Sequence, residues 1–136
     1  MKRDPLAVLH RLREAAVTEA KRNLAAALAS ERQQARQLDD HKQLIRNEQS
    51  LAAGEHLAAF ATWVPCAWQH TERLQTALAT EQAKVAQLQQ ILVRSRTEAE
   101  AVAKAMQRQR DAAALIQARK DQATLDEAAA RRRGVG

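Results

Sequence analysis

Residues 57–116 decide the fold, and they read LAAFATWVPCAWQHTERLQTALATEQAKVAQLQQILVRSRTEAEAVAKAMQRQRDAAALI. In alternating steps of three and four from Leu57 to Ile116, nearly every position is apolar or small. The polar exceptions are Thr71, Glu81, Ser95 and Gln109. A 3.5-residue repeat of this length keeps one stripe facing a partner helix. At about 1.5 Å per residue the stripe spans about 90 Å, which predicts an elongated coiled coil.

The first third of the chain supplies a partner stripe for this seam. Val17, Leu24, Leu38 and Ile45 fall on one seven-residue lattice, which Glu31 interrupts. Asp4 is suited to cap a helix that starts at Pro5, and glycines follow the last periodic residues. No strand pattern is present. The sequence therefore predicts an all-α protein that forms one domain over residues 1–136, a long antiparallel two-helix coiled-coil hairpin. Its first helix covers about 5–52, its second runs to about 131, and 132–136 form a flexible tail.

Two residues compete for the turn, which lies within residues 50–65. Gly54 suits a left-handed position after the first helix. Pro65 suits the first turn of the second helix and would give arms of equal length. The seam favours Gly54, because it continues backward through Pro65 to Leu57, and a proline inside the helix would then kink it at a cost of about 3 kcal/mol.

The residues that support chemistry are scarce and dispersed. The four histidines have no metal-ligand spacing to one another or to Cys66, the single cysteine, which also excludes an internal disulfide. No phosphate-binding loop or nucleophile motif appears, and no run of about 18 apolar residues is present. We therefore expect no enzyme activity, no cofactor, no metal and no membrane insertion.

The net charge of +6 is concentrated at the two ends of the chain. Residues 1–22 carry six basic and three acidic side chains, residues 104–133 carry eight and four, and the middle carries eight and nine. A hairpin brings the two basic segments to one end, where an acidic partner is favoured over nucleic acid because no aromatic residue is available to stack on bases. The candidate partner-binding residues there are Arg119, Lys120, Arg131, Arg132 and Arg133.

The region around the turn has the opposite character. Residues 57–71 carry no charge and contain every aromatic side chain of the chain, namely Phe60, Trp63 and Trp68. The two tryptophans cannot both lie on the seam, so at least one is expected to face outward. Exposed tryptophan is a frequent interface anchor. The competing interpretation is that Phe60 and one tryptophan simply close the turn.

Both ends of the chain resemble the FliJ family of flagellar type III export proteins, which is related to the YscO-type stalk proteins of injectisomes. The likeness is carried by PLAVLHRLREAAVTEAKRNLAAAL at residues 5–28 and by RQRDAAALIQARKDQATLDEAAARR at residues 108–132, with its Leu125-Asp126-Glu127 element. The length and the expected hairpin also agree. The Ala-rich composition without tyrosine departs from the family pattern. The residues with which the family binds the export gate therefore cannot be matched to positions in this sequence.

The resemblance implies a non-enzymatic stalk of the cytoplasmic export apparatus, at the inner face of the membrane. Its partners would be the hexameric export ATPase, into which the end with the paired termini inserts, and the cytoplasmic domain of the export gate, with export chaperones as further candidates. Two alternatives follow from the residues alone. One is a coiled-coil adaptor or chaperone that holds a client at its Trp-bearing tip. The other, less favoured, is a basic rod that binds nucleic acid.

Overall fold

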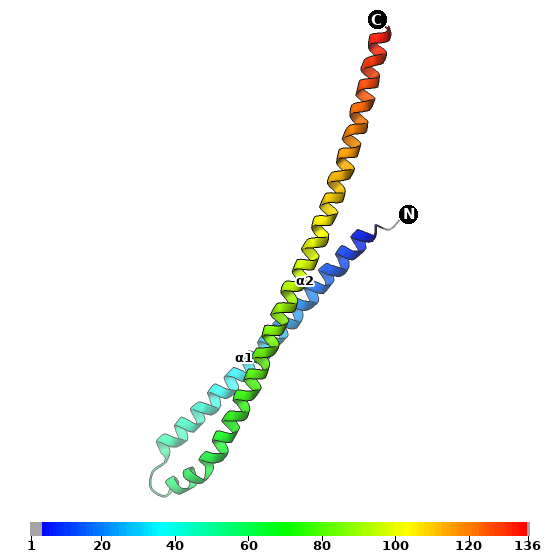
Figure 1. The fold of residues 1–136 in the computed structure, drawn as a ribbon. Helices are drawn as coiled ribbons and strands as arrows, with labels where there is room; N and C mark the ends of the chain where they lie inside the picture. Colours follow the sequence, from blue (N-terminus) through cyan, green and yellow to red (C-terminus); the bar gives the residue numbers. More distant parts are fainter. Residues whose placement is uncertain (1–3, 136) are drawn as a thin grey trace. The chain divides into compact units, whose positions relative to one another are not determined.

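The computed structural model describes residues 4–135, which form two α-helices, α1 (Pro5–Leu51) and α2 (His56–Val135). The helices run antiparallel and pack against each other as a hairpin (Figure 1). The predicted all-α, two-helix architecture is therefore confirmed.

The start of α1 is capped by the residue that the sequence indicated. The backbone N–H of Leu6 donates a hydrogen bond of 3.0 Å to Oδ1 of Asp4, and the N–H of Val8 donates to the Asp4 carbonyl at 3.2 Å. Pro5 occupies the first helical position, where its missing N–H leaves no helical bond unmade. Local chemistry thus fixes where α1 begins.

The turn between the helices is centred on Gly54. This residue has φ = 61°, in the left-handed region that glycine adopts without steric cost. The N–H groups of His56 and Leu57 then donate to the carbonyls of Ala53 and Gly54, each at 3.3 Å, and start α2. The other turn candidate, Pro65, lies inside α2. Its ring removes one helical hydrogen bond and crowds the preceding turn, and Figure 1 shows α2 bending close to its start.

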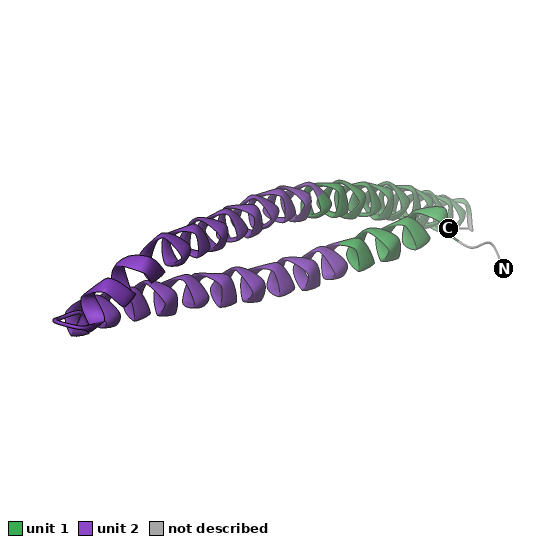
Figure 2. Ribbon diagram, turned by 90° about the horizontal axis from the view of Figure 1, so that it is seen from below, with its two compact units in different colours: residues 1–16, 95–136 green, residues 17–94 purple. Residues whose placement is uncertain are grey.

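The chain divides into two compact units, each built from both helices (Figure 2). Unit 2 comprises residues 17–94, and its interior is one strip of apolar side chains. Small alanines alternate there with larger residues, which lets the two backbones approach closely. The buried members are Val17, Ala20, Ala27 and Leu38 from α1, and Ala67, Val85 and Leu92 from α2.

Unit 1 comprises residues 1–16 and 95–136, and only part of it is paired. Ala99 and Val102 of α2 are buried. An ion pair joins Arg13 Nη1 to Glu98 Oε2 at 2.7 Å, with the side chains 41% and 45% exposed. Such an exposed pair contributes less than about 1 kcal/mol. The pair is informative because it shows that Arg13 of α1 faces Glu98 of α2.

The predicted seam is wrong at both of its ends. Every residue from 107 to 134 is exposed, including the seam positions Gln109, Ala113 and Ile116, and Leu57 is 57% exposed. The register explains the loss. Pro5, where α1 begins, lies eight residues before Arg13, and eight residues beyond Glu98 is Met106. The periodic pattern continues past Met106, but α1 provides no partner for it.

The end of α2 also differs from the sequence-based expectation. The helix continues through Arg132 and Arg133 to Val135, where a flexible tail was predicted, while Gly136 lies outside the described residues. The basic side chains at positions 131–133 are therefore carried on helix.

The positive φ of Gly54 predicts a selective effect of adding a methyl group. We expect Gly54→Ala to lower the free energy of unfolding by about 1 kcal/mol, because an L-residue is strained in this region although nothing lies within 4 Å of the new Cβ. Gly134→Ala is the matched control, since it has open space and no positive φ. Urea unfolding followed by circular dichroism measures both. Equal effects of the two changes would contradict the role of Gly54.

Because the helices stop pairing at Met106, substitutions at two seam positions on either side of it should change the free energy of unfolding unequally. Val102→Ala should lower the free energy of unfolding by about 1 kcal/mol, because a buried contact is lost. Ile116→Ala should change it by less than about 0.5 kcal/mol, because Ile116 is 54% exposed. The same urea titrations compare the two variants. A large loss at Ile116 would mean that the seam is paired beyond Met106 in solution.

Candidate functional site

The described part of the chain contains neither a metal-binding cluster nor a membrane-spanning helix. Among residues 4–135, no three His, Cys, Asp or Glu side chains are arranged to hold a metal ion. Within the same residues, neither helix contains a stretch apolar enough to cross a bilayer. The structure offers two candidate surfaces of distinct character.

The first surface is the exposed α2 segment, residues 107–134. Lacking α1 beside it, this segment is supported by its own side chains. The amide groups of Gln107, Gln117 and Gln122 donate to the carboxylates of Asp111, Asp121 and Asp126, four residues further on, at 2.9, 3.0 and 3.1 Å. Pairs at this spacing, together with many alanines, stabilise isolated helices. The segment can thus remain helical while all its sides stay free for a partner.

All five candidate basic residues lie on the exposed α2 segment. They form two groups, Arg119 with Lys120, and Arg131 with Arg132 and Arg133, every one exposed. The groups are separated by 11 residues, or about 17 Å along a helix, so the structure does not gather them into one cluster. Over residues 107–134, seven basic side chains stand against four acidic ones. The segment therefore offers distributed positive charge to a partner that tracks a helix.

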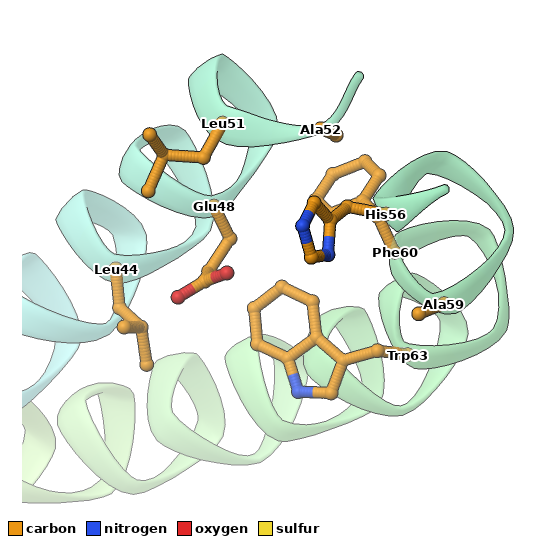
Figure 3. A pocket seen from close by; sticks show the side chains of 8 residues that line it. All are labelled: Leu44, Glu48, Leu51, Ala52, His56, Ala59, Phe60 and Trp63. Atoms are coloured by element: carbon orange, nitrogen blue, oxygen red, sulfur yellow. The ribbon is translucent and has the colours of Figure 1, made fainter. Parts of the chain in front are cut away.

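The second surface is a groove beside the turn, within unit 2, with a volume of about 720 Å³ (Figure 3). Phe60 and Trp63 lie side by side on its α2 wall, with ring centroids 6.0 Å apart and ring planes at 45°. The structure thus brings these two predicted residues together. The groove is lined by Leu44, Glu48, Leu51, Ala52, His56, Ala59, Phe60 and Trp63.

The α1 wall of this groove was not foreseen from the sequence. Leu44, Glu48 and Leu51 recur at steps of four and three, so they share one face of α1 beside its seam. That spacing was a signal, but only the position of the turn shows that this face meets the aromatic residues. In Figure 3 the Glu48 carboxylate points into the groove toward the Trp63 indole.

Trp68 belongs to a different surface from Trp63. It is 61% exposed and does not line the groove. Five residues of helix separate the two tryptophans, which is a rotation of about 140° around the axis. The outward-facing tryptophan that the sequence required is therefore Trp68, while Trp63 is half-buried at the groove.

Two histidines that appeared scattered in the sequence meet across the hairpin. The rings of His41 and His70 pack edge to face with centroids 4.6 Å apart, and His41 Nε2 donates to the Ala67 carbonyl at 2.9 Å. The Thr71 hydroxyl donates to the same carbonyl at 3.0 Å. This contact joins α1 to α2 within unit 2 and is structural.

A comparison with protein-family models gives one informative match. The model described as the flagellar FliJ protein matches residues 1–134. Comparisons with curated proteins and with solved structures gave no match.

The contacts of His41 predict that replacing it destabilises the protein more than replacing another histidine of unit 2. His41→Ala should lower the free energy of unfolding by about 1 kcal/mol, because it removes a hydrogen bond and a ring contact between the helices. His56→Ala is the control, because His56 is exposed in the first turn of α2. Thermal and urea unfolding compare them, and equal losses would refute a specific role of His41.

Proposed function

Because the chain belongs to the FliJ family of flagellar proteins, it is a component of the flagellar export apparatus, and we propose that it couples the export ATPase to the export gate. In this proposal the protein works without catalysis, at the cytoplasmic face of the membrane. Its partners are the hexameric ATPase ring and the cytoplasmic domain of the gate, and export chaperones are further candidates.

The observation that carries the proposal is the exposed α2 segment. A helix that enters a protein ring needs all its sides available, and residues 107–134 are exposed throughout. It must also stay ordered without its own partner, which the alanines and the three Gln–Asp pairs support. The segment belongs to unit 1, where 13 basic and eight acidic side chains leave a charge of +5. An acidic ring interior would attract this charge.

The surfaces near the turn support the second contact of the proposal. Trp68 is exposed in a region without charge, and large aromatic side chains of this kind dominate binding energy at interfaces. We assign Trp68 to the contact with the gate or with export chaperones. The same observation favours the alternative function, a coiled-coil adaptor that holds a client through Trp63 and Trp68 and has no effect on the ATPase.

The proposal predicts that changes to the two surfaces impair different activities, ATPase stimulation in one case and flagellar export in the other. The ATP hydrolysis rate of the cognate export ATPase should rise when the protein is added at equal protomer ratio. Deleting residues 119–136 should return the rate to its basal value, because the basic part of the exposed α2 segment is removed. Trp68→Ala should leave this stimulation intact, because Trp68 lies outside the exposed α2 segment. It should reduce flagellar export in cells, because it removes the side chain assigned to the second contact.

The controls separate the proposal from its alternatives. Stimulation should weaken as salt is raised, since screened charges attract less. Absence of stimulation at every salt and protein concentration would reject the coupling role and leave the adaptor function. Binding to DNA or RNA that falls steeply with salt and survives loss of both tryptophans would support the nucleic-acid alternative instead.

A further inference from the structure

The groove beside the turn combines an apolar lining with a single charge. Its walls are leucine, alanine, the rings of Phe60 and Trp63, and the imidazole of His56, and the exposed Glu48 supplies the only carboxylate among them. Within residues 4–135, no side chain or backbone group pairs with the Glu48 carboxylate by an ion pair or hydrogen bond. The carboxylate points into the groove rather than along the helix surface (Figure 3). The groove thus combines aromatic and aliphatic side chains with one carboxylate that is free to pair with a cation.

This pairing of groups matches one kind of side chain. A guanidinium group is planar, stacks on the face of an indole ring, and donates hydrogen bonds from its edge to a carboxylate. Trp63 supplies the indole, Phe60 a second ring 6.0 Å away, and Glu48 the carboxylate. An ammonium group is more strongly hydrated and cannot form the paired hydrogen bonds of arginine to a carboxylate. Arginine is therefore the better complement.

The dimensions of the groove call for more than one side chain. Its volume of about 720 Å³ lies within the range of about 300–1,000 Å³ that is usual for ligand clefts. Leu44 and Leu51, which flank Glu48 on α1, are 46% and 69% exposed. They would remain in contact with water if only a guanidinium entered. Apolar neighbours on the same partner would cover them, and a helix presents such neighbours three and four residues away.

We propose that the groove binds an amphipathic helix of a partner protein through one arginine flanked by leucine-like side chains. The arginine lies between Glu48 and Trp63, and its neighbours cover Leu44 and Leu51. The inference adds a binding surface distinct from that of Trp68, and it rests on the proposed function only for the identity of the partner. Binding to the groove is measured without the ATPase, so either proposal can fail while the other stands.

The composition of the chain provides a direct probe. It contains two tryptophans and no tyrosine, so in the Trp68→Phe variant Trp63 is the only strong fluorophore. The probe ligand is an acetylated, amidated, side-chain-stapled helix of about 16 residues. It consists of alanine and glutamine, with a central arginine and leucines three and four residues to either side. Titration should shift Trp63 emission in a saturable way.

Two changes then test the arginine–carboxylate contact as a cycle. Replacing the peptide arginine with citrulline, which has nearly the same shape without charge, should weaken binding about tenfold or more. Glu48→Gln should weaken binding of the arginine peptide by a similar factor and remove the difference between the two peptides. The matched control is Glu55→Gln, which removes a carboxylate in the turn that does not line the groove. It should leave both affinities unchanged.

Each remaining outcome overturns the proposal in a defined way. Equal affinity for the two peptides would show an apolar groove without cation selection. A loss on Glu55→Gln as large as that on Glu48→Gln would show general charge attraction. Sedimentation that reveals a self-associated chain, from which the peptide displaces one copy without preference for arginine, would assign the groove to a second copy. No emission change at millimolar peptide, with circular dichroism intact, would show that the groove does not bind this chemistry.

Discussion

Two helices can bury only the strip that each presents to the other, and this single contact limits everything else in the chain. The buried side chains are alanine, valine and leucine at seam positions, and none is both large and fully enclosed. Polar groups on the strip weaken it further, because Nδ1 of His10 and Oε2 of Glu81 are buried without a hydrogen-bond partner in the described structure. Each such atom costs on the order of 1–3 kcal/mol.

Register is the property that ties the turn to the two surfaces. Residues that meet across the hairpin in the two units follow one rule, since the numbers 13 and 98, like 41 and 70, sum to 111. Facing residues of a hairpin lie equally far from its turn, so their numbers add up to about twice the number of the central turn residue. A turn at Gly54 gives about 108, close to the observed sum, whereas a turn at Pro65 would give about 130. The same rule brings Leu44 and Glu48 opposite the first turns of α2, and it ends the pairing of α2 at Met106. The left-handed residue at position 54 therefore determines both the groove and the length of the exposed α2 segment.

The sequence was sufficient for the architecture and for most of the seam. From Phe60 to Met106 the positions expected from the 3-4 spacing are buried or half-buried, because periodicity records which face a helix hides. It was insufficient beyond Met106, because Gln109, Ala113 and Ile116 continue the pattern without a partner in this chain. Periodicity shows that a face is suited to packing, and only the length of α1 shows whether something packs on it.

The two surfaces differed in how far they were foreseeable. Lysine and arginine on a helix are exposed by default, so the positions of Arg119, Lys120 and the terminal arginines required no knowledge of tertiary structure. The groove required two segments to be brought together, and the sequence supplied only its α2 half, Phe60 and Trp63. Glu48 could not be distinguished in the sequence from other surface carboxylates, and only the fold shows that it lines the same groove as Trp63.

The opposite charges of the two surfaces have a consequence for how partners are distinguished. The exposed α2 segment is cationic and favours an acidic, water-lined partner, whereas the groove is anionic and apolar. A ligand suited to one surface is repelled or left unpaired by the other, and such mismatch adds to the discrimination that attraction provides. The coupling role that we propose would need this property, since exchange of the two surfaces would break the connection. On a hairpin that buries only one narrow strip, surface charge of opposite sign is one means of achieving it.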